Sequence, residues 1–303
     1  MASPEHDALA ERMLADHGGG RLVREDRPSP DALVAAIELM DASALDIDPG
    51  VSAAAGTVGG VDGVWFTPAG TEGSDQTIVY FHGGGYMFGT ARNTGHVTAR
   101  IAREARARAF SVDYRLSWQA PFPAALDDAL AVYRGLLDDG VPASSIAVAG
   151  DSAGGGLAIA LLVAARDAEL PLPCAAYATS AYTDLAVTGA SAHEVDDPIV
   201  TAVGLRMLGD GYLDGRDPTT PLASPLYADL TGLPPLLLHV GGFEALRDDS
   251  TRLADRARAA GVDVTLEVLD GVIHIWQYFG PDLPETARTD RDAGAFLRSH
   301  LDA

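Results

Sequence analysis

Residues 146–165 read IAVAGDSAGGGLAIALLVAA. An apolar run of strand length comes first, a turn of small residues follows, and the second apolar run has the length of a helix. The turn Gly150-Asp151-Ser152-Ala153-Gly154 matches G-x-S-x-G, in which a strained strand-to-helix turn exposes a serine at the end of a sheet. This interpretation makes Ser152 a nucleophile. The alternative is a turn of small residues that only packs a helix against a strand.

Two glycines of this turn favour the nucleophile. Bulky side chains two residues before or after the serine would collide with the neighbouring chain in so strained a turn, and Gly150 and Gly154 avoid that collision. The expected helix 153–165 directs the positive end of its dipole toward the reacting oxygen. That field would stabilise a developing oxyanion.

A second glycine block, His82-Gly83-Gly84-Gly85, directly follows the apolar run 78–81. Esterases carry part of their oxyanion hole after such a strand, because glycines let backbone N–H groups approach the substrate oxygen. We expect the amides of Gly83 and Gly84 to act with that of Ala153, and His82 to anchor the loop. A phosphate-binding loop is the alternative, but it requires a lysine and the chain contains none.

The general base should follow the serine and the acid in chain order. Three histidines lie between Ser152 and the C-terminal tail: His193, His239 and His274. His239 falls inside an apolar run and is interpreted as a core residue, whereas His193 belongs to an insertion. His274 comes after an expected strand, on a loop at the carboxyl end where parallel sheets place their sites. His274 is therefore the predicted base.

The predicted acid is Glu244, the first acidic residue after the apolar run 236–240. From that position a carboxylate can bind the far nitrogen of His274, fix its tautomer and stabilise the imidazolium. Asp248 and Asp249, about one helical turn later, are the alternatives and are interpreted as carboxylates at the start of a helix.

Strand-like and helix-like segments alternate along the chain, which predicts a mostly parallel sheet covered by helices on both faces. The expected strands are 77–81, 109–113, 146–150, 175–179, 236–240 and 264–269, with an entry strand or hairpin within 58–67. The expected helices include 124–137, 153–165 and 248–260. One domain spanning residues 1–303 is expected. Residues 1–45, with a helical run at 32–40, and residues 184–232, with a helix at 201–208, do not fit the alternation and are interpreted as cap material.

Composition excludes several classes of function. The 43 acidic residues outnumber 21 basic ones, all arginine, and the net charge of −22 argues against nucleic-acid binding. The longest apolar stretch, 157–165, is far shorter than the roughly 20 residues of a membrane span, so none is expected. The first ten residues lack the apolar region of a secretory signal, which predicts a cytoplasmic protein. The single cysteine, Cys174, excludes an internal disulfide and is expected in the core.

Taken together, these motifs resemble the bacterial hormone-sensitive-lipase-like esterases from about Ile78 to the C-terminus. The resemblance includes the blocks His82 to Tyr86, Asp113 to Leu116, Pro121 to Ala125 and Gly150 to Gly155. It implies the α/β-hydrolase fold and a helical cap, from residues 1–45 and part of 184–232, over an acyl pocket. Two departures stand out. Ser117-Trp118-Gln119 replaces the usual Ala-Pro-Glu, which puts a structural contact of that glutamate in doubt, and Glu244 stands where the family commonly has aspartate.

The expected activity is hydrolysis of short-chain carboxylic esters through an acyl-enzyme, on a small-molecule substrate and without a metal or organic cofactor. Large side chains beside the catalytic elements are expected to line a narrow acyl pocket: Tyr86, Phe88, Tyr182, Ile275 and Trp276. The same triad would open lactones or carbamates, and a non-catalytic small-molecule receptor on this fold is a further alternative. The assembly state is open, with a homodimer as one candidate.

Overall fold

The computed structural model describes residues 1–16, 38 and 46–303. Within these residues one sheet of eight strands runs in the order β1-β2-β4-β3-β5-β6-β7-β8. The strands are β1 Val51–Val58, β2 Val61–Pro68, β3 Thr77–Phe81, β4 Arg108–Val112, β5 Ile146–Asp151, β6 Ala175–Thr179, β7 Leu236–Gly241 and β8 Val264–Leu269. β3 to β8 are parallel to one another, whereas β2 pairs antiparallel with β1 and β4. The mostly parallel sheet predicted from the alternation is confirmed.

The N-terminal hairpin is longer than expected. It pairs Val51 with Pro68 and Val58 with Val61, and Gly59 and Gly60 form its turn with positive φ angles of 59° and 81°. Its first strand begins seven residues before the predicted segment, because the sequence SAAAG is largely exposed and carries no apolar alternation. A side chain at Gly59 would collide with the backbone of α4, since an added Cβ would lie 1.9 Å from the carbonyl oxygen of Ala131.

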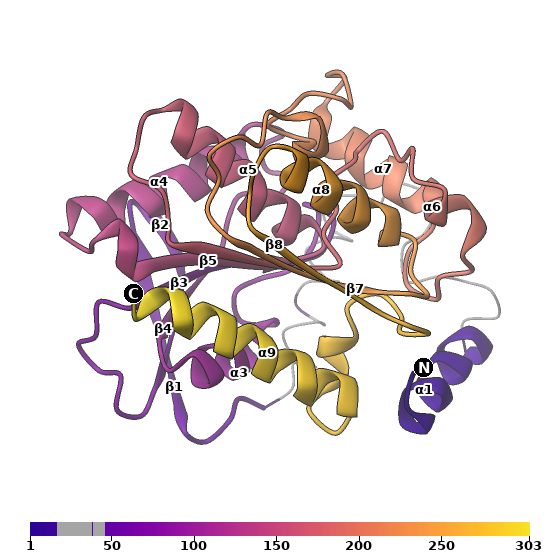
Figure 1. Cartoon of the computed structure of the whole chain (residues 1–303), viewed down its shortest axis with the longest axis horizontal. Coiled ribbons are helices and arrows are strands. Elements are labelled where there is room, and N and C mark those ends of the chain that lie inside the picture. Colours follow the sequence, from indigo (N-terminus) through magenta and orange to yellow (C-terminus); the bar gives the residue numbers. More distant parts are fainter. Residues whose placement is uncertain (17–37, 39–45) are drawn as a thin grey trace.

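Helices cover both faces of the sheet (Figure 1). One face packs against α4 Ala124–Asp138, α5 Ala153–Asp167 and α8 Arg247–Ala259, which agree with the predicted helices within two residues. The other face packs against α3 Gly95–Ala105 and α9 Pro284–Leu301, which were not among the expected helices. Their apolar pattern is interrupted by a buried ion pair, in which Arg100 Nε of α3 lies 2.6 Å from Asp290 Oδ2 of α9. Charged residues at buried positions interrupt the apolar periodicity by which a helix is predicted from its sequence.

Residues 184–232 form an insertion between β6 and β7. It contains the short helix α6 Ser191–Glu194, the helix α7 Ala202–Leu213 and the 3-10 turn η2 Pro225–Tyr227. Thr201 caps α7, because its hydroxyl accepts a 2.8 Å bond from the amide of Gly204, and the helix extends five residues beyond the predicted end. Leu208 of α7 packs against Met87 and the half-buried Phe88, so the helix lies against the loop that follows β3.

The N-terminal region is described in part. Helix α1 Pro4–Asp16 is anchored through Ser3, whose hydroxyl donates to Glu285 Oε2 at 2.9 Å, and through His6 Nε2, which accepts from the amide of Ile273. Most of the helical run expected at 32–40 lies outside the described residues. Across the described ranges, none of the helices combines the length and apolar character needed to cross a bilayer.

Cys174 directly precedes β6 and is a free, half-buried thiol. Burial raises the pKa of this thiol to about 11. It contributes to the apolar layer beneath α3 and α9, as expected for a core residue.

Candidate active site

Ser152 occupies a strained turn between β5 and α5. Its backbone has φ 50° and ψ −120°, a conformation that side chains rarely adopt, and its side chain is 7% exposed. An added Cβ on Gly154 would lie 2.0 Å from the carbonyl oxygen of Phe81, and one on Gly150 would lie 2.4 Å from that of Gly154. The two glycines are therefore required by close backbone contacts, as the sequence pattern indicated.

His274 and Glu244 lie with Ser152 at the carboxyl ends of the parallel strands. His274, on the loop after β8, places Nε2 3.1 Å from Ser152 Oγ. Its Nδ1 lies 3.4 Å from Oε1 of Glu244, which follows β7. All three side chains are buried, and they come from three loops separated by up to 122 residues. The structure thus brings together the three residues that sequence reasoning selected.

Ser180 is a residue of this site that the sequence pattern did not reveal. Its hydroxyl donates to Glu244 Oε2 at 2.8 Å and accepts from the amide of Ile275 at 3.3 Å. The amide of Gly241 donates to the same Oε2 at 2.8 Å. The glutamate therefore keeps one oxygen for His274 while the other is fixed by two donors. A lone serine after a strand carries no sequence signal for such a role.

Asp197 is a second missed residue, and it belongs to the insertion 184–232. Its buried carboxylate accepts from the amides of Ile199 and Val200 at Oδ1 and from the amide of Ala245, next to Glu244, at Oδ2. Burial raises the pKa of this carboxyl. The contact ties the insertion to the loop that carries Glu244.

The charge on His274 is stabilised by its surroundings. Burial by itself would lower the pKa of His274, but the hydrogen bond and charge of Glu244, together with Asp197 and Asp151, raise it above its ordinary value. A stabilised imidazolium is the state that the histidine enters when it takes a proton from a nucleophile.

The alternative acids have other partners. Asp248 accepts from the amide of Ser191 at 3.0 Å and pairs with Arg247. Asp249 is buried, and one of its oxygens accepts from the amides of Thr183 and Asp184 at 2.8 Å each. Both carboxylates hold the insertion onto α8 rather than approaching His274.

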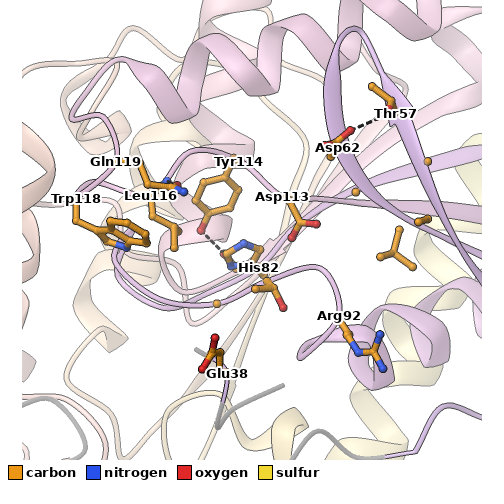
Figure 2. Close-up of a pocket in the computed structure, with 16 residues that line it drawn as sticks. Glu38, Thr57, Asp62, His82, Arg92, Asp113, Tyr114, Leu116, Trp118 and Gln119 are labelled. Atoms are coloured by element: carbon orange, nitrogen blue, oxygen red, sulfur yellow. Dashed lines mark hydrogen bonds between the residues drawn. The ribbon is translucent and has the colours of Figure 1, made fainter. Parts of the chain in front are cut away.

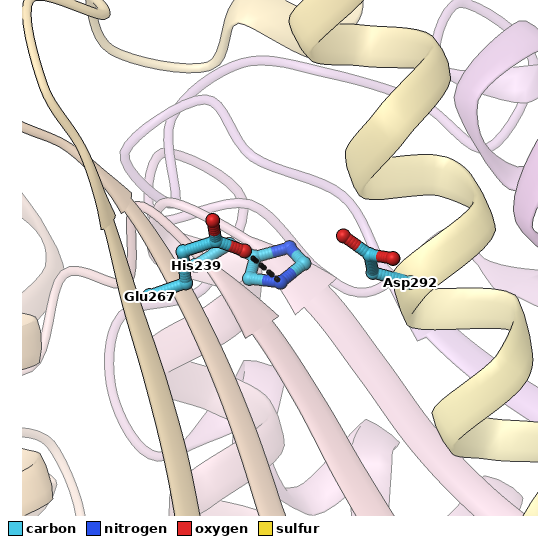
Figure 3. A group of neighbouring side chains, drawn as sticks. All are labelled: His239, Glu267 and Asp292. Atoms are coloured by element: carbon cyan, nitrogen blue, oxygen red, sulfur yellow. Dashed lines mark ion pairs between the residues drawn. The ribbon is translucent and has the colours of Figure 1, made fainter. Parts of the chain in front are cut away.

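The alternative bases lie away from Ser152. His193 is exposed, and its ring binds the carbonyl of Val187. His239 is buried within β7, and burial lowers its pKa to about 3. Its ring faces Glu267 of β8 and Asp292 of α9 (Figure 3), with Nε2 3.7 Å from Glu267.

The trio His239, Glu267 and Asp292 contains ligand types that bind transition metals. Both carboxylates are already paired with a cation, because Arg288 forms ion pairs with Glu267 and with Asp292. The arrangement is therefore that of a solvent-facing ion-pair network over a neutral histidine.

The glycine loop after β3 is held from several sides. The ring of His82 stacks on Tyr114 at 4.3 Å, its Nδ1 lies 2.7 Å from the carbonyl oxygen of Gly83, and the Tyr114 hydroxyl donates to the carbonyl of His82. This agrees with the anchoring role expected for His82. Gly84 has a φ of 110°, which favours glycine.

The three amides predicted to bind an oxyanion share one feature. Among the described residues, none of the amides of Gly83, Gly84 and Ala153 donates a hydrogen bond to a backbone acceptor. Gly83 also lies close to Asp151, since a Cβ added to this glycine would lie 2.2 Å from Asp151 Oδ2. The assignment of these amides to an oxyanion hole stays a prediction.

The expected pocket residues divide into two groups. Tyr86 stacks on Tyr212 with ring centres 3.8 Å apart, and Tyr182 is buried with its hydroxyl bound to the carbonyl of Leu205. Both lie beneath the insertion, close to α5. Phe88 and Ile275 are half-buried near the site. Trp276 was wrongly expected to line the pocket, because it is fully buried against Leu269 and Val272 and donates to Thr289.

A cavity of about 800 Å³ lies on the other side of the glycine loop, toward the N-terminal hairpin (Figure 2). His82, Tyr114, Trp118 and Asp113 line it, but Ser152 and His274 do not.

Ser117-Trp118-Gln119, which replaces the usual Ala-Pro-Glu, makes a structural contact without that glutamate. Gln119 Oε1 accepts a 2.9 Å bond from the amide of Leu116, so this side chain supplies a local contact of its own.

Comparisons with known proteins agree with this architecture. A family model described as "alpha/beta hydrolase fold" matches residues 78–278. An acetyl-hydrolase of Streptomyces hygroscopicus is 44% identical over 245 residues, which cover 80% of this chain and 81% of the relative. An esterase of Acinetobacter venetianus is 32% identical over 227 residues, covering 74% and 75%. The crystal structure of an esterase from the bacterial hormone-sensitive lipase family superposes with a TM-score of 0.90 at 41% identity, over 99% of both chains.

Proposed function

The chain belongs to the bacterial hormone-sensitive-lipase-like esterases of the alpha/beta hydrolase fold, and we propose that it cleaves short-chain esters through an acyl-serine at Ser152. It is a carboxylic ester hydrolase, in agreement with the resemblance stated from its motifs. The 3.1 Å separation of Ser152 Oγ and His274 Nε2 carries the proposal for the nucleophile and the base.

The reaction begins when Ser152 Oγ attacks the ester carbonyl and His274 Nε2 accepts the hydroxyl proton. The tetrahedral intermediate collapses as its bond to the alkoxy oxygen breaks, and His274 returns the proton to the leaving alcohol. A water molecule then gives a proton to His274 and attacks the acyl carbon; as the bond to Ser152 Oγ breaks, His274 returns the proton to this oxygen, which releases the acid and restores Ser152. Glu244 holds the imidazole in the required tautomer and stabilises its charged form.

The oxyanion of each tetrahedral intermediate binds the amides of Gly83, Gly84 and Ala153 in this proposal. Each such donor contributes about 100- to 1,000-fold to turnover. The N-terminus of α5 adds its positive dipole end at the same oxygen.

A short acyl group fits the surroundings of Ser152. Tyr86, Tyr182 and Leu208 are all nearly fully buried beneath or within the insertion 184–232, and Leu208 packs against the glycine loop. We propose that this insertion caps the pocket, together with the N-terminal region. A relative that shares 44% identity is named an acetyl-hydrolase, and a structural neighbour at 37% identity was soaked with p-nitrophenyl butyrate, which agrees with small acyl groups.

The test compares the purified chain with Ser152→Ala on p-nitrophenyl acetate and butyrate. The unsubstituted protein should hydrolyse both esters, and the variant should lose up to about a millionfold in kcat because the nucleophile is absent. Circular dichroism and the thermal midpoint should match those of the parent, which separates loss of chemistry from loss of fold. Retention of more than about 1% of kcat would contradict the role of Ser152.

A further inference from the structure

Asp151 is a buried carboxylate that the proposed chemistry does not use, although it is the chain neighbour of Ser152. Its side chain is 2% exposed at the end of β5. The hydroxyl of Tyr80 donates to Oδ1 at 2.7 Å, and the hydroxyl of Tyr278 donates to Oδ2 at 3.0 Å. The amide of Gly83 is the third donor group that faces this carboxylate, and it helps to lower the pKa of Asp151.

The three donors come from segments that carry different parts of the site. Tyr80 lies in β3, which leads into the glycine loop, and Gly83 lies in that loop. Tyr278 lies in the 3-10 turn η3 Trp276–Phe279, which begins two residues after His274. Asp151 therefore joins the oxyanion loop and the histidine loop to the nucleophile turn. The contact is close, since a Cβ added to Gly83 would lie 2.2 Å from Asp151 Oδ2.

An ionised carboxylate offers acceptor sites to all three donors at once. A protonated carboxyl group carries a hydrogen on one oxygen; a tyrosine hydroxyl that faces this oxygen can rotate and accept the hydrogen, whereas the Gly83 amide can only donate. Protonation of Oδ2 would therefore turn the Gly83 peptide away from the carboxyl group. A rotation of the Gly83 peptide would move the neighbouring amide of Gly84.

We propose that ionised Asp151 is a positioning residue, which sets the Gly84 amide and the His274 loop relative to Ser152 and releases them when it takes up a proton. This inference rests on the proposed ester hydrolysis. Asp151 does not touch the reacting atoms in this view; it acts through the loop and the turn that it binds.

Burial raises the pKa of Asp151 to about 6, although Tyr80, Tyr278, the Gly83 amide and the positive charge of His274 all lower it. The buried hydroxyls of Tyr114 and Tyr177 also interact with the charge of Asp151, which raises the pKa of each tyrosine. Because Asp151 must be ionised, activity should be lost as the pH falls through this pKa. The same direction holds for His274, whose raised pKa means that the base is also lost on acidification.

The experiment is a pH profile of kcat/KM from pH about 4.5 to about 8 with p-nitrophenyl acetate, for the parent and for Asp151→Asn. Two protonations suppress the parent at low pH, so log(kcat/KM) should fall with a slope that approaches about 2 over the one to two log units below the pKa of Asp151. Asp151→Asn keeps only the protonation of His274, and its slope should be about 1. Its kcat at neutral pH should fall about 10- to 100-fold with KM nearly unchanged, because the loop is misplaced.

Tyr80→Phe is the second variant, and it keeps the carboxylate while removing one donor. The ionised form then loses a hydrogen bond, so the pKa of Asp151 should rise and the lower break of the profile should move to higher pH by about half a unit to one unit. Tyr133→Phe is the matched control. It removes a tyrosine hydroxyl that binds the carbonyl of Pro171, far from Asp151 in the sequence and in a different element, and it should leave the profile unchanged.

A parental kcat and a slope of about 2 in folded Asp151→Asn would overturn the inference. If Asp151→Asn does not fold, an unmoved lower break in Tyr80→Phe overturns it instead. Either result, obtained while Ser152→Ala is inactive, leaves the proposed function intact. Ester turnover that survives Ser152→Ala would instead overturn the proposed function itself.

Discussion

Glu244, the predicted acid, is one methylene longer than the aspartate that is common at this position in the family. The surrounding donors fix the longer side chain, since Ser180 and the Gly241 amide both bind Oε2 and leave Oε1 to face His274. A carboxylate at this place fixes the histidine tautomer only if its own orientation is fixed. The residue type matters less here than the two donors that orient it.

Glu244→Gln should therefore lower kcat by about 10³- to 10⁴-fold, because the neutral amide no longer selects the reactive tautomer of His274. Asp248→Asn is the matched control, and its kcat should stay within about twofold of the parent because this carboxylate binds Ser191 and Arg247 instead. Steady-state kinetics on p-nitrophenyl acetate measure both. The reverse ranking would place the acid of the triad at Asp248.

Sequence reasoning selected Ser152, Glu244 and His274 because they follow predicted strands in a fixed chain order. It missed Ser180 and Asp197, since each acts through hydrogen bonds with residues distant in the chain. It also placed Trp276 in the pocket, because adjacency to His274 does not show which side of a 3-10 turn a side chain occupies. Motifs mark the reacting groups, whereas the groups that orient them depend on tertiary contacts.

At the scale of elements, α7 defines one wall over the glycine loop. A Cβ on Gly85 would lie 2.5 Å from Leu208, so helix and loop are already in close contact. Each methylene of an acyl chain gains about 0.8 kcal/mol where it can be buried and loses more where it must overpack a wall. The optimum acyl length should therefore be short and should depend on Leu208.

The parent should reach its highest kcat/KM between p-nitrophenyl acetate and butyrate in a series that extends to palmitate. Leu208→Ala removes part of the wall and should move the optimum by about two carbons toward longer chains. Val203→Ala, at an exposed position of the same helix, should leave the series unchanged. A parental maximum at palmitate would indicate an open lipase groove and would contradict the capped pocket.

The elements differ in how well the sequence predicted them. Apolar runs such as β3 and β5, which are buried along their whole length, were predicted within one residue. The start of β1 was not predicted, because its small, exposed residues show no alternation of apolar and polar positions. α3 and α9 were missed because buried Arg100 and Asp290 satisfy each other across the two helices. Their pairing exists only in the folded chain.

For the whole molecule, the net charge of −22 sets a condition on stability. Like charges on a compact surface repel one another, and dissolved salt screens that repulsion over a Debye length of about 10 Å at 0.1 M. The thermal midpoint should rise by several degrees, on the order of 5 °C, between roughly 20 mM and 0.5 M sodium chloride.

Differential scanning fluorimetry measures that shift, and tetramethylammonium chloride at equal ionic strength is the control. Equal shifts with both salts indicate screening, whereas a response to sodium alone would indicate a specific cation site. A midpoint that falls with ionic strength would mean that attractive surface ion pairs such as Arg288 with Glu267 outweigh the net repulsion.

The half-buried Cys174 has a practical consequence for fluorescence work. A thiol whose pKa is about 11 is almost entirely unreactive toward maleimides at neutral pH, and a surface cysteine is roughly 300-fold richer in thiolate. Because the chain contains no other cysteine, a dye attached after Val203→Cys would sit on α7 alone. Cys174 therefore does not have to be replaced before a second cysteine is introduced for site-selective labelling.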